Sequence, residues 1–311
     1  MTNEQERPAR SADPASLAPV LGLRRDGTGH ADSARGLLTT VLGELVLPLG
    51  GEAWTGTLVE ALDLVGVRDK AARQAVARLH ERGWLERRQV GRRARWRLTP
   101  SARDLLERGG SRIYGHGAGA SEWDGRWRLL LLSVPESHRH LRYRLSVGLS
   151  WAGFAPLGQG LWLSARPSAE GEAATVVERL GLGAATTFVA EVGQLGDDAE
   201  LAARAWDLAE VARLHVRFLA DEAAPPPDEP GPAAARLAGL VHRWRRFPSF
   251  DPGLPPALLP ADWPGGEAAA RFDQLRRALS GPSRRWWADA EHRHGGGRPG
   301  QGRRAPPTLD R

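Results

Sequence analysis

The stretch that most limits the fold is LERRQVGRRARWRL, residues 85–98. Apolar and polar residues alternate on both sides of Gly91, and this period of two is typical of β-strands. A glycine between two such runs indicates a tight turn, so we expect a β-hairpin. Six of its fourteen residues are arginines, which makes the expected hairpin strongly cationic.

Three helical segments precede this hairpin. Apolar residues at helical spacing predict helices over residues 33–49, 55–65 and 68–83. Three helices followed by a hairpin is the order of a winged helix-turn-helix domain, whose third helix enters the major groove of DNA. A further helix starts at Thr99 and Pro100, so this domain is expected to span residues 33–114. In the third helix, spacing of i, i+3, i+4 and i+7 predicts a buried face made of Ala72, Ala75, Val76 and Leu79.

Positive charge is concentrated in the same block. The stretch from Arg68 to Arg97 holds eleven basic and three acidic residues, whereas the whole chain carries a net charge of only +6. Such concentration favours a polyanionic partner, and double-stranded DNA fits the predicted fold. The alternative is a solvated basic hairpin in a chain that is rich in arginine throughout.

Ten side chains are candidates for DNA contact. Arg73 and Gln74 suit the edges of guanine and adenine, respectively. Because side chains alternate along a strand, the hairpin arginines cannot all face the same partner. The candidates on the third helix are Arg68, Lys70, Arg73, Gln74 and Arg78, and those on the hairpin are Arg87, Arg88, Arg92, Arg93 and Arg95.

Two more structured units follow. Residues 122–195 predict the order β-α-β-β-α-β, which is that of a ferredoxin-like domain and hosts many functions. Residues 196–290 predict a helical region that begins with one long helix over residues 197–223. The fold class is therefore α+β, with a winged helix-turn-helix, a ferredoxin-like middle domain and a helical C-terminal region. Residues 1–32 and 291–311 are rich in proline, glycine and charge and are expected to be disordered.

The middle domain offers candidates for a small-molecule site. Aromatic side chains at its start can form a ligand wall, and basic side chains can meet an acidic ligand. The alternatives are that the tryptophans are core anchors and that the basic helix face is only solvated. These candidates are Trp123, Trp127, Arg128, His140 and Arg144.

Several classes of protein are not supported by the sequence. There is no cysteine, so disulfides and cysteine-ligated metals are excluded. His138 and His140 are two apart on an expected helix and point in different directions, and no metal site or cofactor is predicted. No apolar run reaches the roughly 18 residues of a membrane span, and the N-terminus lacks the apolar part of a signal peptide. We expect a cytoplasmic protein without a membrane segment.

Five stretches resemble one family. They read GLLTTVLGELVLPLGGEAW onward through the hairpin, SRIYG, EWDGRWRLLLLSVPE, RHLRYRLSVGLSWAGFAPLGQGLWLSARP and FPSFDPGLPPALLPADWPG. Together they span residues 33–290 and are similar to the PaaX family of bacterial repressors of phenylacetate catabolism. The resemblance implies a homodimer that binds a palindromic DNA operator. It also implies release from that operator by an aromatic acyl-CoA such as phenylacetyl-CoA.

An enzyme is the principal alternative. The middle domain also resembles that of CRISPR-associated adaptation endonucleases, which place an aspartate at the end of the first strand. Here that strand ends in LLLLSV with Ser133 and no aspartate, so nuclease activity is not predicted and the chain is expected not to be an enzyme. A protein that grips DNA through the same hairpin without regard to sequence is a second alternative. The operator, the regulated genes and the choice between repressor and activator stay open.

Overall fold

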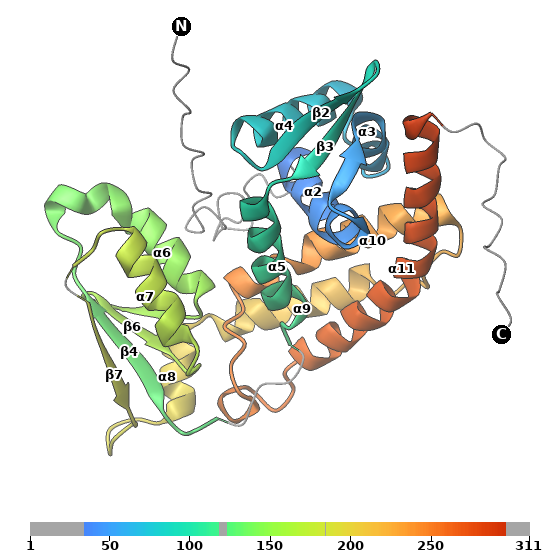
Figure 1. Ribbon diagram of the computed structural model, residues 1–311. Coiled ribbons are helices and arrows are strands. Elements are labelled where there is room, and N and C mark those ends of the chain that lie inside the picture. Colours follow the sequence, from blue (N-terminus) through green and yellow to red (C-terminus); the bar gives the residue numbers. More distant parts are fainter. Residues whose placement is uncertain (1–33, 118–122, 184, 297–311) are drawn as a thin grey trace, which may run out of the picture.

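The structure, a computed structural model, describes residues 34–117, 123–183 and 185–296. Figure 1 shows a sheet-containing middle unit beside an N-terminal unit, and long helices that run beneath the latter. Helices combine with two antiparallel sheets, so the predicted α+β class is confirmed. The predictions of disorder for residues 1–32 and 297–311 lie outside the described residues.

The N-terminal unit follows the predicted order of helices and hairpin. The first predicted helix is divided into an α-helix, a π-helix and a 3-10 helix in turn. The helical chain nevertheless ends where its glycine and proline signals predict, at Gly50, which adopts a left-handed conformation with φ of 108°. The unit comprises α2 (Ala34–Val41), the π-helix η2 (Leu42–Val46), the 3-10 helix η3 (Leu47–Leu49), β1 (Glu52–Trp54), α3 (Thr55–Asp63), α4 (Asp69–Glu81), β2 (Leu85–Val90), β3 (Arg93–Leu98) and α5 (Pro100–Tyr114).

Two details of this unit bear on the predicted site. The buried residues of α4 are the four that the spacing predicts: Ala72, Ala75, Val76 and Leu79. Strand β1 was not predicted, and it pairs with β3 through Glu52 and Arg97 to give a sheet of order β1-β3-β2. A strand of three residues is too short to leave a readable alternation in the sequence.

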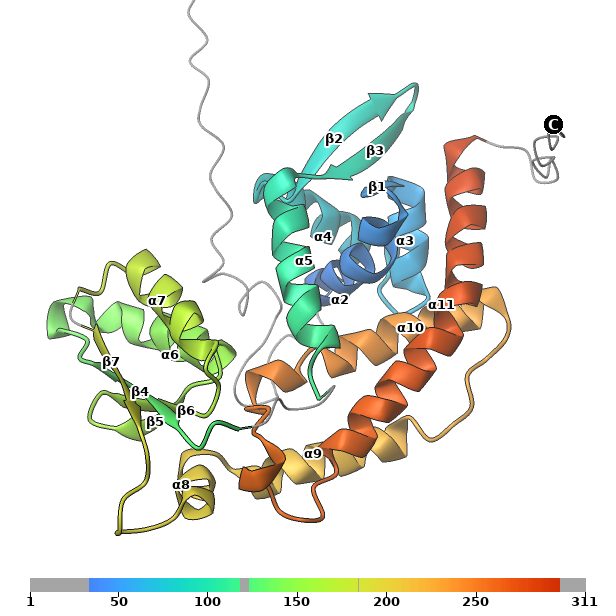
Figure 2. The same cartoon turned by 60° about the horizontal axis from the view of Figure 1, so that its bottom comes forward.

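The middle unit has a four-stranded sheet in the order β5-β6-β4-β7, with every neighbouring pair antiparallel. Helices α6 and α7 cover one face of the sheet (Figure 2). Leu130 and Leu132 of β4 pack in the core beneath them. The elements are β4 (Trp127–Leu132), the 3-10 helix η4 (Glu136–Leu141), α6 (Arg142–Trp151), β5 (Ala155–Gly158), β6 (Leu161–Ser164), α7 (Ala169–Arg179) and β7 (Ala185–Ala190).

The single helix predicted over residues 197–223 is wrong. The chain forms α8 (Asp198–Ala205) and α9 (Leu208–Asp221), and Trp206 between them is extended, with φ of −128° and ψ of 141°. The Asp207 side chain accepts a hydrogen bond from the Glu210 backbone N–H and so begins a new helix. The apolar repeat continues across the break, which is why the sequence pattern did not reveal it.

The C-terminal region ends in two long helices, α10 (Pro230–Trp244) and α11 (Gly265–Gly295). Between them lie the 3-10 helices η5 (Phe247–Ser249) and η6 (Pro256–Leu258). Helix α11 continues through Gly295, so the prediction of disorder is wrong for residues 291–295. Figures 1 and 2 show that α11 bends and rises beside the N-terminal unit.

One apolar core joins the N-terminal unit to α10 and α11. Leu38 and Leu42 of the first helical segment belong to the same buried cluster as Trp244 and Phe272. Trp244 is fully buried, and its indole N–H donates to the Ile113 carbonyl oxygen at 3.0 Å. The middle unit has its own core beneath α6 and α7, and on the other face of its sheet it shares a smaller core with Leu208 of α9 and with Leu254 and Leu258. The N-terminal unit and the C-terminal helices therefore form one packed body.

Candidate nucleic-acid interface

Helix α4 presents a polar face to solvent. All five of its predicted DNA contacts are exposed: Arg68, Lys70, Arg73, Gln74 and Arg78. At about 1.5 Å per residue, its thirteen residues extend about 20 Å, and a helix fits the roughly 12 Å width of the major groove. The small side chains of Ala72 and Ala75 on the buried face let α4 pack closely against α2 and α3.

The strands β2 and β3 divide the hairpin arginines between two faces. Arg87 lies opposite Trp96, on the face that contains the buried Leu85 and Leu98. Arg88 lies opposite Arg95, on the other face. The expectation that the hairpin arginines do not share one direction is therefore confirmed.

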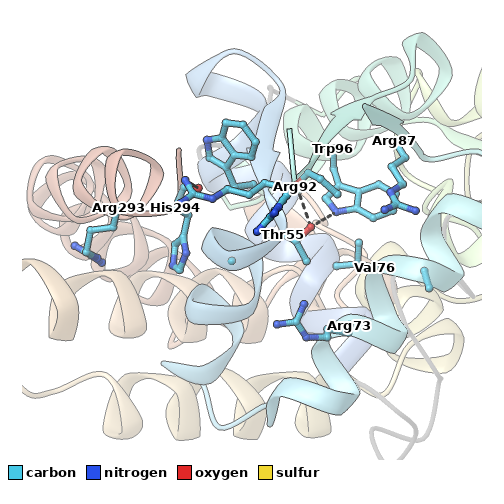
Figure 3. Close-up of a pocket in the computed structure, with 13 residues that line it drawn as sticks. Thr55, Arg73, Val76, Arg87, Arg92, Trp96, Arg293 and His294 are labelled. Carbon is cyan, nitrogen blue, oxygen red and sulfur yellow. Dashed lines mark hydrogen bonds between the residues drawn. The ribbon is translucent and has the colours of Figure 1, made fainter. Parts of the chain in front are cut away.

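A cavity of about 490 Å³ lies between α4, the hairpin and the end of α11 (Figure 3). Its cationic lining residues are Arg73, Arg87, Arg92, Arg93 and Arg293, together with His294. Thr55 at the start of α3 closes one side, where its hydroxyl donates to the Ala94 carbonyl oxygen and accepts from the Trp96 indole N–H. Helix α3 and the hairpin are thus fixed to each other beside the cavity.

The arginines around this cavity differ in how they are neutralised. Arg73 forms two hydrogen bonds to Asp69 at 2.7 and 3.0 Å, and these hold the pKa of Asp69 below its usual value. Among the described residues, no carboxylate forms an ion pair with Arg87 or Arg92. Those two arginines therefore carry uncompensated positive charge, whereas Arg73 must leave Asp69 before it can bind a base or a phosphate.

The end of α11 adds residues that the sequence did not predict for this site. Arg293 donates to Glu60 Oε1 at 2.5 Å, and His294 Nε2 lies 2.7 Å from Glu60 Oε2 on α3. Arg93 in turn donates to the His294 carbonyl oxygen at 2.9 Å. These residues fall in the stretch predicted to be a disordered tail, so only the helical continuation through Gly295 brings them to the site.

Arg95 is held within the protein. Its Nε lies 3.2 Å from Glu52 Oε2, and its guanidinium lies over the Trp54 ring at 5.3 Å. Its Nη2 also lies 3.7 Å from Oε2 of Glu291 on α11. Of the ten predicted contacts, Arg73, Arg87, Arg92 and Arg93 line the cavity. Arg88 and Arg95 do not line it, although by strand register they share a face of the hairpin with Arg93.

Of the predicted small-molecule residues of the middle unit, Trp123 and Trp127 are in contact, with ring centroids 5.4 Å apart, but the five do not form one site. Trp127 is 1% exposed and packs in a core, as its alternative assignment predicts. Arg128 is buried and pairs with Asp124 at 2.6 Å. His140 and Arg144 are exposed on η4 and α6, and of the five residues only Trp123 lines a large cavity, which lies between the units.

The described residues hold no group of three or more side chains that could bind a metal ion. None of the helices in the described part of the chain is long and apolar enough to cross a membrane.

Three consecutive parts of the chain match the domains of one family. Residues 33–102 match "PaaX-like protein", residues 120–202 match "PaaX protein central Cas2-like domain", and residues 206–289 match "PaaX-like protein C-terminal domain". A similar relative is "Transcriptional repressor PaaX" of Escherichia coli (strain K12), which is 32% identical over 252 residues. That alignment covers 76% of this chain and 77% of the relative.

A solved structure shares the fold. "Uncharacterized protein Rv0674 from Mycobacterium tuberculosis" aligns with 83% of this chain and 98% of its own, with a TM-score of 0.53 and 22% sequence identity. The chain belongs to the PaaX family, which confirms the resemblance seen in the sequence. The named relative is a repressor rather than an enzyme, which agrees with the prediction that this chain is not an enzyme.

Proposed function

We propose that this protein is a DNA-binding transcriptional repressor of the cytoplasm that grips an operator with α4 and the β2–β3 hairpin. The single observation that carries the proposal is the exposed cationic face of α4 beside the arginine-lined cavity. Helix order and the paired strands support a winged helix-turn-helix in which α4 enters the major groove. Arg87 and Arg92 would then meet the phosphate backbone.

The strand order of the middle unit supports the ferredoxin-like assignment. Its elements follow the order β-α-β-β-α-β along the chain, and β4 lies between β6 and β7 in the sheet. The family description of this part as Cas2-like does not favour a nuclease. Strand β4 ends at Leu132 and is followed by Ser133, without the aspartate expected of such an enzyme.

We further infer that the repressor is a homodimer, since a palindromic operator requires two copies. Leu131 and Phe188 are 48% and 50% exposed on the sheet face opposite α6 and α7, and Phe188 lies on the edge strand β7. An apolar edge of this kind favours pairing with a second copy. Sedimentation of the wild-type chain and of a Leu131→Asp, Phe188→Asp variant tests this: a dimer that the variant does not form is the expected result.

The binding test uses fluorescence anisotropy of labelled duplexes at about 150 mM salt. DNA from the region upstream of the chain's own gene is compared with a scrambled duplex, and a preference of about a thousandfold is expected of a specific repressor. Arg87→Gln with Arg92→Gln should lower the slope of log affinity against log salt by about 2, because two phosphate contacts are lost. Arg204→Gln on α8 is the matched control, since it removes an exposed arginine that lies away from the cavity.

Two results would contradict this function. Equal affinity for both duplexes would indicate a sequence-independent DNA-binding protein. An unchanged salt slope in the double variant would mean that the cavity does not contact the DNA.

The effector implied by the family resemblance is an aromatic acyl-CoA, and phenylacetyl-CoA added to the operator complex should release the DNA.

A further inference from the structure

A second cavity, of about 820 Å³, lies where the three units meet. The end of α5 contributes Arg112 and His116, the loop after β6 contributes Arg166, and the start of α11 closes the far side through Gly265 and Gly266. A molecule bound here therefore touches the N-terminal unit, the middle unit and the C-terminal helices together.

Two arginines in its wall share one carboxylate. Arg112 donates to Glu172 Oε2 at 3.0 Å, and Arg166 donates to Glu172 Oε1, also at 3.0 Å. The cluster therefore has a net charge of +1. Because guanidinium groups pair best with acidic oxygens, it has room for a second acid group.

Arg112 has a buried hydrogen-bond donor without a partner. Its side chain is 15% exposed, and its Nε atom is buried without a hydrogen-bond partner among the described residues. Burial, and then the neighbouring charge of Arg166, lower the pKa of Arg112 to about 10. An acid group in the cavity would oppose the second of these effects on the pKa, since it would supply a negative charge beside the two guanidinium groups.

The lining also includes Asp251, whose carboxylate is held by two histidines, and a group of apolar and aromatic side chains. Trp123 comes from the start of the middle unit and Trp263 from the loop before α11, and Leu254 and Leu259 lie nearby. His116 is fixed at the edge of the cavity because its Nε2 lies 3.0 Å from Asp251 Oδ2. Asp251 also holds His215 at 2.7 Å, so the carboxylate joins the segment after α5 to α9.

We propose that this cavity is the effector site and that it binds an organic anion whose acid group pairs with Arg112 and Arg166. The apolar part of the ligand lies against Trp123 and Trp263. The proposal rests on the proposed function, because it assigns a place to the ligand that controls the repressor.

The same geometry gives the ligand a route to the DNA-binding unit. Its acid group competes with Glu172 for Arg112, and the Arg112–Glu172 pair is a contact between α5 and α7. A ligand that takes over Arg112 binds better when this contact is open, so it shifts the protein toward the open arrangement. Helix α5 directly follows the hairpin strand β3, and a change in its position therefore reaches the DNA-binding face.

The test measures ligand binding by isothermal titration calorimetry on the full chain without DNA. The probes are phenylacetyl-CoA, phenylacetate and coenzyme A, each up to about 1 mM. Binding by phenylacetate identifies a carboxylate as the acid group, whereas binding that requires the coenzyme A portion identifies a phosphate. Three single variants are compared with the wild type: Arg166→Gln, Glu172→Gln and Arg217→Gln.

The variants are expected to act in opposite directions. Arg166→Gln removes a charged hydrogen-bond donor and should weaken binding about tenfold or more. Glu172→Gln removes the competing carboxylate and should strengthen binding about threefold. Arg217→Gln removes an exposed arginine that lines a neighbouring cavity and should leave affinity unchanged.

Absence of binding by all three probes would overturn the proposal. Equal affinity of Arg166→Gln and the wild type would also do so, as would weakening by both Arg166→Gln and Glu172→Gln, because a purely structural role moves both variants the same way. Operator binding is measured separately and without ligand. Its failure would refute the repressor function while leaving the result for the cavity intact.

Discussion

The N-terminal unit meets its two neighbours by different means. Against α10 and α11 it shares one apolar core, in which Leu38 and Leu42 pack with Trp244 and Phe272. Against the middle unit its contact includes the Arg112–Glu172 ion pair, a stacking of Arg112 on the Trp151 ring at 5.2 Å and a large cavity.

The two contacts differ in the free energy needed to open them. Burial of apolar surface contributes about 25 cal/mol per Å², so a shared core is costly to open. A partly exposed ion pair contributes about 1 kcal/mol or less, and an acidic ligand can replace it. The contact of the N-terminal unit with α10 and α11 is therefore the costlier one to open. In its contact with the middle unit, where Val147 and Trp151 also pack against that core, the ion pair is the part that an acidic ligand can replace.

The largest effect is expected from a substitution in the apolar core that the N-terminal unit shares with α10 and α11. Trp244→Ala should lower the free energy of unfolding by about 3–5 kcal/mol, because it leaves a large hole in the shared core. It also removes the hydrogen bond to Ile113 at the end of α5. Urea denaturation followed by far-ultraviolet circular dichroism measures the change. The control is Tyr143→Ala, at a residue that is 58% exposed, and it should change the free energy of unfolding by less than about 0.5 kcal/mol. If Trp244→Ala lowers the free energy of unfolding by less than about 1 kcal/mol, the shared core is contradicted.

A smaller effect is expected at Asp251, which joins the segment after α5 to α9. Asp251→Asn should cost about 1–3 kcal/mol at pH 7, because the charged acceptor of two buried histidines is lost. Burial alone would raise the pKa of Asp251, but the hydrogen bonds from His116 and His215 hold it well below its usual value. Stability from a lowered carboxylate pKa is present above the unfolded value of about 4 and is lost as pH falls below it.

The pH dependence gives that prediction its check. Urea denaturation at pH 7, 5 and 3 should show the difference between wild type and Asp251→Asn shrinking at the lowest pH. A difference that stays constant would mean that the carboxylate charge does not stabilise this junction.

The smallest effect on stability is expected at the ion pair between the N-terminal and middle units. Glu172→Gln should lower the free energy of unfolding by about 1 kcal/mol or less, since Glu172 is more than a third exposed and glutamine still offers an oxygen to Arg112. The same denaturation experiment measures it. A loss comparable to that of Trp244→Ala would show that the two junctions are equally rigid.

The sequence predicted those elements whose signal is local and periodic. Helix α4 is an example, because its buried face follows from the 3.6-residue repeat and its exposed arginines follow by exclusion. The hairpin was equally readable from its alternation around Gly91. Elements without such a signal were missed, as β1 and the break at Trp206 show.

The sites were less predictable than the elements that carry them. Arg293 and His294 reach the arginine-lined cavity only because α11 continues along the N-terminal unit, and no local pattern shows where a helix packs. Asp251 had one weak signal, a lone charge within the apolar stretch FPSFDPG. Its partners His116 and His215 are 135 and 36 residues away, so only the fold could reveal them.

Helix α11 extends from one cavity to the other. Its first residues, Gly265 and Gly266, line the cavity between the units, and its last turn places Arg293 and His294 at the arginine-lined cavity. Pro282 lies within the helix and lacks the N–H that would bond to the preceding turn, which accounts for the bend in Figures 1 and 2. The thirteen residues beyond Pro282 extend about 20 Å, and Trp286 and Ala290 among them belong to the core that the N-terminal unit shares with the C-terminal helices. The two cavities therefore lie at opposite ends of one helix whose second half is held in place by apolar packing.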